Sequence, residues 1–382
     1  MKKVLVFILC FAMVFSICGC GKQTNSSSKE DITAEQTDNI DAVEVDICEE
    51  TVRNYLNAAT VEEQFSLLNE FSGVSYDYQT LELDWNYDGS TEFILWLSEK
   101  SDFSNAIKSV VTTMYVETTT LVPGKTYYWK VTGDLTDDTL GSGKIKVKDA
   151  PVRWIKIDGS GNVRDMGGWI TESGKTVKYE MMYRGKALDN ITDAGKATVK
   201  LLGLKTEIDV RGSWNKPNPP QIGLNYVFID TAAQYDYIFK PECEEEVKKN
   251  YKEIFKLLSD KSNYPIYTHC SAGADRTGTF AFITNGLLGV SYEDLTRDFE
   301  LTSFSNSGKR WRGNGDGNTF GPNDLEMKVE GNYVAWGAMY KEMMDNYDTG
   351  DGKLSSAIEN YLISYIGVPK SQIDSFKKIM LK

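Results

Sequence analysis

The segment YTHCSAGADRTGT, residues 267–279, has the densest pattern of chemically active side chains in this 382-residue chain. Residues 265–269 are predicted to form a strand, and a glycine-containing loop then leads into a helix. A strand, a tight loop and a helix in this order direct successive backbone N–H groups into the loop, where they can bind a phosphate dianion. The pattern therefore predicts an anion-binding loop in an α/β domain.

The residue types in this loop favour nucleophilic chemistry. The field of the N–H groups lowers the pKa of Cys270, so that its thiolate is present near neutral pH. Arg276 can bind two phosphate oxygens with its planar fork, and the Thr277 hydroxyl can stabilise the departing thiolate. Gly273 lets the backbone approach a ligand closely. Because the loop supplies the positive field, we expect neither a metal nor a cofactor. The predicted phosphate-binding residues are Ser271, Ala272, Gly273, Ala274, Asp275, Arg276 and Thr277.

The Cys-x5-Arg spacing resembles the signature of the protein tyrosine phosphatase superfamily. Residues 162–168 (NVRDMGG), 182–185 (MYRG) and 208–211 (IDVR) resemble motifs of a bacterial family of that superfamily, some of whose members are exported. The resemblance covers residues 151–382, including a helical C-terminus. It implies a phosphocysteine intermediate and substrates such as phosphotyrosine, phosphoserine or phosphothreonine in proteins, or phosphoinositides. One position departs from the family: Ala274 stands where a lysine suited to phosphoinositides is common.

Three further residues are expected to support the loop from behind. His269 is the single histidine of the chain. Neighbouring strand residues point to opposite faces, so His269 is not a suitable base for Cys270 and is expected to bond the loop backbone. Arg164 and Arg211, from the resembling motifs, are assigned the same supporting role.

The general acid is left open between several carboxylates. It must face the bound phosphate in order to protonate the leaving oxygen. Asp275, in the loop, and Asp209, at a neighbouring strand end, are the main candidates. Asp230 and Asp236 follow the next predicted strand and are weaker ones.

A basic cluster, Lys309, Arg310 and Arg312, stands out in an acidic protein. A solvated loop is the favoured interpretation, and the alternative is a substrate rim that holds a second anionic group of the substrate.

Composition excludes several classes of function. Asp and Glu number 55 against 42 Lys and Arg, for a net charge of −13, which disfavours a nucleic-acid-binding role.

The N-terminal 19 residues resemble a lipoprotein signal peptide, with Cys20 as the lipidated residue. An ordinary secretory peptide is the alternative. We therefore expect an exported protein attached to the membrane by a lipid.

The remaining chain divides into segments of different character. Residues 20–47 are polar and acidic and are predicted to be a flexible tether, and residues 48–73 a short helical segment. Alternating apolar residues in 74–150 predict a β-sandwich, and LVPGKTY (121–127) resembles a fibronectin type III domain. Residues 151–382 alternate strands and helices, which indicates a mainly parallel sheet flanked by helices. Predicted strands cover 205–211, 224–231 and 265–269, and a helix covers 243–260.

Two rival functions and one cross-link also fit the sequence. The chain could bind phosphorylated ligands at a surface without catalysis, as an adhesin, but the intact Cys270 and Arg276 disfavour this. It could instead hydrolyse inositol polyphosphates such as phytate. A disulfide between Cys48 and Cys243 is conceivable outside the cell, although no spacing pattern supports it.

Overall fold

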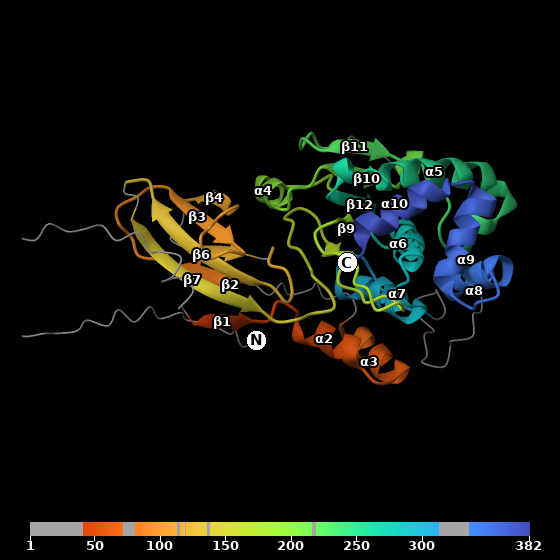
Figure 1. Ribbon diagram of the computed structural model, residues 1–382, viewed down its shortest axis with the longest axis horizontal. Helices are drawn as coiled ribbons and strands as arrows, with labels where there is room; N and C mark the ends of the chain where they lie inside the picture. Colours follow the sequence, from red (N-terminus) through yellow and green to blue (C-terminus); the bar gives the residue numbers. More distant parts are fainter. Residues whose placement is uncertain are drawn as a thin grey trace, which may run out of the picture. The chain divides into compact units, whose positions relative to one another are not determined.

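The computed structural model describes residues 41–71, 81–112, 115–118, 120–135, 138–215, 219–312 and 336–382. The predicted signal peptide, Cys20 and the tether before residue 41 lie outside these residues. The chain forms two compact units (Figure 1). The first contains β1 with residues 80–118 and 125–147, and the second contains residues 46–79, 119–124 and 148–382. Among the helices described, none is both long and apolar enough to cross a membrane.

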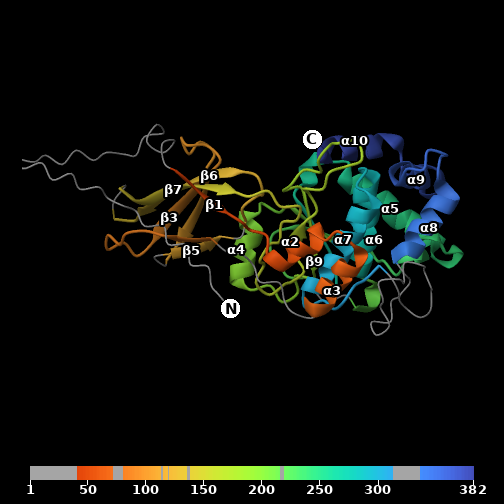
Figure 2. The ribbon, with the colours of Figure 1, turned by 90° about the horizontal axis from the view of Figure 1, so that it is seen from below.

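The first unit consists of two β-sheets (Figure 2). One sheet has the strand order β1-β7-β6-β3-β4 and the other pairs β2 with β5. The alternation in the sequence is confirmed, since Leu81 and Leu83 of β2 are buried between exposed neighbours. Trp85 meets Phe93 of the larger sheet edge-on at 5.4 Å. The strands are β1 (Ala42–Val45), β2 (Leu81–Asp84), β3 (Phe93–Ser98), β4 (Ile107–Val111), β5 (Tyr115–Thr118), β6 (Thr126–Gly133) and β7 (Thr139–Val147).

The boundary of the predicted tether needs a correction. Residues 42–45 form strand β1, which pairs in parallel with the β7 segment 144–147. Three of these four residues, Ala42, Val43 and Val45, are apolar, and backbone hydrogen bonds join them to the open edge of the sheet. Further along, Cys48 is buried in the core of the second unit.

The second unit is built on a sheet with the order β11-β10-β12-β9-β8 (Figure 1). β12 lies between β10 and β9 and runs parallel to both, whereas β8 pairs antiparallel with β9. This agrees with the predicted mainly parallel sheet. The strands are β8 (Arg164–Asp165), β9 (Met182–Lys186), β10 (Thr206–Asp209), β11 (Asn225–Phe228) and β12 (Ile266–Cys270). The α-helices are α2 (Glu50–Asn57), α3 (Val61–Phe71), α4 (Asp193–Leu201), α5 (Glu244–Leu258), α6 (Asp275–Leu287), α7 (Tyr292–Glu300), α8 (Trp336–Tyr347), α9 (Leu354–Asn360) and α10 (Lys370–Met380). Short 3-10 helices are η1 (Ser213–Asn215), η2 (Tyr235–Phe239), η3 (Pro241–Cys243), η4 (Lys261–Asn263) and η5 (Leu301–Phe304), and η6 (Tyr361–Ile366) is a π-helix.

The two faces of this sheet are covered by separate apolar clusters. Tyr183 and Tyr267 pack with Val199 of α4 on one face. Met182 and Ile266, their strand neighbours, pack on the other face in the large core. Successive strand residues point to opposite faces, which explains this division.

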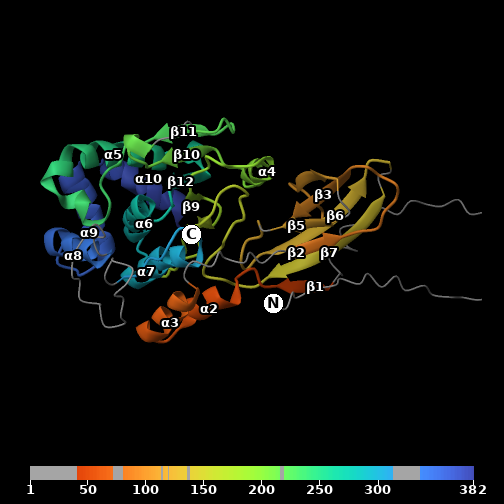
Figure 3. The same cartoon turned by 180° about the vertical axis from the view of Figure 1, so that it is seen from behind.

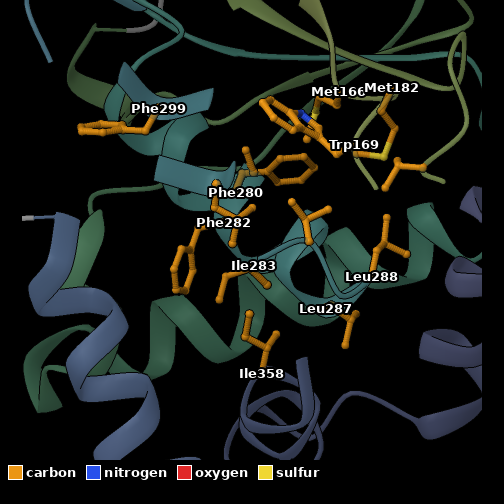
Figure 4. Close-up of a cluster of buried hydrophobic side chains, with 14 of the residues drawn as sticks. Met166, Trp169, Met182, Phe280, Phe282, Ile283, Leu287, Leu288, Phe299 and Ile358 are labelled. Carbon is orange, nitrogen blue, oxygen red and sulfur yellow. The ribbon is translucent and has the colours of Figure 1, made fainter. Parts of the chain in front are cut away.

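Helix α6 passes through the middle of the large core (Figure 4). Its residues from Thr277 to Leu287 are all buried, with Phe280 and Ile283 surrounded by other apolar side chains. The buried polar residues of the helix include Thr284, whose hydroxyl donates to the Phe280 carbonyl oxygen at 2.9 Å. The core therefore fixes the helix whose first turn forms part of the loop at Cys270.

The segment predicted at 48–73 is helical but does not stand apart. Helices α2 and α3 lie beside α7 in all three views of the chain, as Figure 3 shows from behind. Val52, Tyr55 and Leu68 belong to the large core of the second unit. Their burial removes apolar surface from water, which a free helical segment could not do. Both helices are thus part of the second unit.

Candidate active site

Cys270 is the last residue of β12, and α6 begins at Asp275. All five residues of β12 are buried, because neighbouring strands and both apolar clusters enclose it. The loop of residues 271–274 therefore connects two immobilised elements. The Cys270 side chain is held at the N-terminus of α6, where the partial positive charge of a helix is concentrated.

Gly273 is required by the loop's contact with β9. Its φ is +68°, and a Cβ there would lie 2.2 Å from the carbonyl oxygen of Gly185. The sequence suggested that this glycine makes room for a ligand. The neighbour that it accommodates is the backbone of β9.

Buried side chains hold the loop carbonyls from behind. Arg184 Nη2 donates to the carbonyl oxygen of Gly273 at 2.9 Å, and Asn162 Nδ2 donates to that of Ala272 at 3.1 Å. With its carbonyls bonded on this side, the loop can turn N–H groups toward an anion.

Arg164 acts on the loop through two intermediaries. Its Nη1 donates to Asn162 Oδ1 at 2.7 Å, and its Nε donates to Asp298 Oδ1 at 2.7 Å. Asp298 Oδ2 also accepts from Arg184 Nη1 at 2.6 Å. Burial opposes ionisation of Asp298, but the two guanidinium groups lower its pKa below the ordinary value. Asn162, Arg184 and Asp298 were not singled out from the sequence. The first two lie in the NVRDMGG and MYRG motifs, whereas Asp298 lies in none.

The Cys270 thiol is prepared for ionisation. Its side chain is buried, which alone would raise the pKa, but Thr277 and the charge of Arg276 lower it below the ordinary value. Thr277 Oγ1 is buried and has no hydrogen-bond partner among the described residues. Arg276 Nη1 is also buried without a hydrogen-bond partner among the described residues. An unsatisfied buried donor costs roughly 1–3 kcal/mol, which an anion bound in the loop would recover.

His269 lies on the opposite side of the strand from the Cys270 side chain. Its Nε2 is 2.8 Å from Glu207 Oε1, and its Nδ1 is 3.2 Å from the carbonyl oxygen of Cys270. Burial opposes the charged form, but Glu207 and Asp209 raise the pKa of His269. The ring is thus occupied in holding the end of β12. This position is the supporting one that we expected for it.

Asp209 is fully buried and its carboxylate is already bonded on both oxygens. It accepts from Arg211 Nε at 2.9 Å, Arg211 Nη2 at 2.7 Å and the Tyr226 hydroxyl at 2.7 Å. Burial raises its pKa, but these donors and His269 outweigh it and lower the pKa. Arg211 Nη1 continues to Asp189 at 2.6 Å. Such a carboxylate supports the sheet end and is a poor proton donor to a substrate.

Asp275 is the carboxylate that belongs to the loop. Its Oδ1 accepts from Arg310 Nε at 2.6 Å and from the Tyr235 hydroxyl at 2.5 Å, and its Oδ2 accepts from Arg310 Nη2 at 2.8 Å. Burial opposes ionisation, but Arg310, Tyr235 and Arg276 lower the pKa of Asp275. The sequence did not indicate Tyr235.

Asp230 and Asp236 are engaged elsewhere. Asp230 Oδ1 accepts from the backbone N–H of Ser213 at 2.7 Å, and Asp236 Oδ2 pairs with Lys240 Nζ at 3.1 Å. Within the described residues, no hydrogen bond or ion pair joins either carboxylate to residues 270–277.

The substrate-rim alternative needs a correction, because its three residues face different ways. Arg312 is half-buried and donates to Glu300 with Nε at 2.8 Å, and Lys309 Nζ donates to Asn69 Oδ1 at 2.5 Å. Only Arg310 reaches the loop, where it is paired with Asp275. A cluster in the sequence does not show which way consecutive side chains point.

An exposed tryptophan lies next to Arg276. Trp214 in η1 is 69% exposed, and its ring centroid is 5.7 Å from the Arg276 guanidinium carbon. The ring lies against Gly212, where a Cβ would be 2.1 Å from it. Trp214 was not singled out from the sequence, although its place five residues after the end of the parallel strand β10 was a usable signal.

The two other described thiols form no disulfide with each other. Cys48 and Cys243 are free thiols, so the conceivable disulfide is not formed. In the described ranges, His, Cys, Asp and Glu side chains form no group of three or more that could hold a metal ion.

The family of this chain follows from a comparison of its sequence with a family model. Residues 155–382 match the model of the tyrosine phosphatase family. A Cupriavidus necator protein with a provisional name as a tyrosine-protein phosphatase is 24% identical over 168 residues, with 38% of this chain and 61% of that protein covered. The chain thus spans about three fifths of that relative. The core catalytic domain of the S. cerevisiae PP-IP phosphatase SIW14 has 14% identity and a TM-score of 0.26, over 37% of this chain and 77% of that one. The extent of the family match shows that this chain belongs to the tyrosine phosphatase family.

Proposed function

We propose that this protein hydrolyses phosphate monoesters through a phosphocysteine intermediate at Cys270. The observation that supports this most directly is the pairing of a thiol of lowered pKa with a buried, unpartnered Arg276 nitrogen in one loop. The unpartnered donor costs free energy in the empty site, which a bound phosphate oxygen recovers, and the stabilised thiolate is the nucleophile that the reaction needs.

The reaction proceeds in two displacements. The Cys270 thiolate attacks phosphorus, the ester P–O bond breaks, and Asp275 gives its proton to the leaving oxygen. Water then attacks the phosphocysteine, Asp275 takes a proton from that water, and the P–S bond breaks to release the thiolate. Arg276 holds two phosphate oxygens throughout, and the Thr277 hydroxyl stabilises the released thiolate.

We assign the proton to Asp275 because it adjoins the loop and its side chain is partly exposed, whereas the Asp209 side chain is fully buried. It is ionised in the empty site, since Arg310 and Tyr235 lower its pKa. A bound phosphate dianion brings negative charge beside it and raises the pKa again, so that it can take up the proton.

An aryl ester such as phosphotyrosine is the substrate class that we propose. Trp214 is an exposed ring beside the guanidinium that grips the phosphate, so an aromatic leaving group can stack on it. Ala274 is uncharged and fully buried. The position at which the resembling family often has a lysine therefore offers no charge to a polyphosphorylated substrate.

We also propose export and lipid attachment at Cys20, supported by the N-terminal sequence alone. Labelling cells with a lipid precursor tests this, and a Cys20→Ala variant that still carries label contradicts it.

We further propose that the first unit is a fibronectin type III-like sandwich. The pairing of β2 with β5 and the order β1-β7-β6-β3-β4 support this assignment.

The deciding experiment for catalysis is turnover of p-nitrophenyl phosphate in the presence of a chelator. Wild type should turn over, and Cys270→Ser should lose hydrolysis while it still binds inorganic phosphate. Acid quenching should trap phosphate on wild type but not on the serine variant. Phosphate binding without turnover by wild type would make the protein a phospho-ligand-binding module instead.

A further inference from the structure

Residues 309–312 lie between helix α3 and the active-site loop. They follow η5, and Ser303 of η5 fixes the backbone at Arg310. The Arg310 N–H donates to Ser303 Oγ at 2.7 Å, and Ser303 Oγ donates to the Arg310 carbonyl oxygen at 2.8 Å. We call residues 309–312 the connecting segment.

The side chains on either side of Arg310 contact α3. Trp311 meets Phe65 edge-on at 5.1 Å, and Arg312 Nη2 donates to Gln64 Oε1 at 2.6 Å. Lys309 adds the bond to Asn69. Trp311 and Gln64 are almost completely buried, so these are packed contacts rather than exposed charge pairs.

Helix α2 joins the same arrangement through one buried carboxylate. Glu300, at the end of α7, accepts from Arg312 Nε and Nη2 at 2.8 Å each, and it also bonds the Tyr55 hydroxyl. Glu300 is completely buried. Removing any partner would leave a buried charge or hydroxyl without compensation, which costs free energy. The partners therefore hold one another in place.

Arg310 alone in the connecting segment points to the loop, where it forms the two-pronged pair with Asp275. Its position thus depends on η5 and on three neighbours that α3 and α7 hold.

We propose that helices α2 and α3 are a working part of the catalytic site, because they hold the connecting segment so that Arg310 fixes the Asp275 carboxylate. Arg310 is a positioning residue in this scheme. The two helices lie outside residues 155–382, to which the family match applies. The inference rests on the proposed phosphatase function.

The consequence is a defined pH dependence. The groups facing Asp275 are Arg310 from the connecting segment, Tyr235 from η2, and Arg276 with Cys270 from the loop. Asp275 itself raises the pKa of the Cys270 thiol, an effect that Arg310 offsets by neutralising it. Loss of the Arg310 charge therefore raises both pKa values. The acidic limb, set by the thiolate, and the basic limb, set by the Asp275 proton, both move to higher pH.

The test uses the full chain and the pH profiles of kcat/KM and kcat with p-nitrophenyl phosphate, because kcat/KM reports the thiolate of the free enzyme and kcat reports the Asp275 proton of the substrate complex. Arg310→Gln should displace both limbs upward by about one pH unit, as expected for the loss of an adjacent opposite charge. Arg310→Lys should restore part of the shift, since it keeps the charge. Phe65→Ala combined with Gln64→Ala should shift the profile in the same direction, and adding this pair to Arg310→Gln should shift it no further.

Ser66→Ala, at an exposed position of the same helix, is the matched control and should leave the profile unchanged. Circular dichroism and thermal melting establish that each variant is folded. If the double variant is unfolded, Gln64→Ala alone replaces it in the pH profile. A folded α3 variant that loses rate equally at every pH, or whose shift adds to that of Arg310→Gln, overturns the inference. An inactive wild type would refute the proposed function itself.

Discussion

Gly273 of the active-site loop and Gly185 of β9 are in direct backbone contact: a Cβ on Gly273 would lie 2.2 Å from the Gly185 carbonyl oxygen and 2.3 Å from its carbonyl carbon. Gly273→Ala should therefore push the loop away from β9 and also strain a residue at φ +68°. We expect a loss of at least about 1 kcal/mol of stability and a fall in kcat of about a hundredfold, as a misplacement of roughly 1 Å produces. Gly203→Ala, which has a similar φ of +64° but open space, is the control. Equal effects in the two variants would show that strain alone matters.

Arg276 should not be replaceable by lysine. Lysine keeps the charge but loses the planar fork, and the unpartnered Nη1 would have no equivalent. Arg276→Lys should cost about 3–4 kcal/mol of transition-state stabilisation, or several hundredfold in kcat/KM, nearly as much as Arg276→Ala. Steady-state kinetics on an aryl phosphate measures both. A lysine variant with most of its activity would contradict bidentate binding.

The three thiols in the described residues should differ sharply in alkylation. The pKa of Cys270 is lowered, whereas burial raises the pKa of Cys48 to about 12 and also raises that of Cys243. Only a thiolate reacts, so iodoacetamide at pH 6.5 should modify Cys270 first. Peptide mass spectrometry resolves the sites. Bound inorganic phosphate should protect Cys270, and uniform labelling of all three would argue against an activated thiol.

Asp298 should make stability depend on pH. Its folded pKa is lowered by Arg164 and Arg184, so its contribution is present above the unfolded pKa of about 3.9 and is lost as pH falls through the folded value. At pH 7, Asp298→Asn should cost about 3–5 kcal/mol, because two buried guanidinium groups lose their partner.

Calorimetric melting from pH 7 to pH 3 checks this dependence. The gap in Tm between wild type and Asp298→Asn should narrow toward low pH. Asp294→Asn on the same helix removes a partly exposed pair with Arg297 and should cost less than about 1 kcal/mol. A gap that stays constant with pH would mean that the charge of Asp298 is not what stabilises the fold.

Trp214 should select aromatic leaving groups. Trp214→Ala should lower kcat/KM for phenyl phosphate about three- to tenfold, the equivalent of a lost stacking contact of about 0.5–1.5 kcal/mol. It should leave glycerol phosphate unaffected, and Trp214→Phe should retain most of the preference. Ile170→Ala, also exposed but in a different part of the unit, is the control. Equal losses on both substrates would assign Trp214 to holding Arg276 instead.

The local part of the site was predictable from consecutive residues. A strand, a loop with Gly273 and a following helix were predicted there, because their geometry depends on neighbours in the chain; the start of the helix at Asp275 comes from the structure. The same holds for His269, which alternation alone placed away from Cys270. Predicted strands at 205–211, 224–231 and 265–269 correspond to β10, β11 and β12, with ends shifted by one to three residues.

The partners of charged side chains were decided only by tertiary structure. Lys309, Arg310 and Arg312 form one basic cluster in the sequence, yet Arg310 pairs with Asp275 while Arg312 pairs with the buried Glu300. Likewise, a short amphipathic stretch at 48–73 does not reveal which core it covers. Contacts between residues far apart in the chain depend on how the whole sheet and its helices pack. The sequence thus determined the chemistry of the loop through local geometry, whereas long-range packing determined which residues position it.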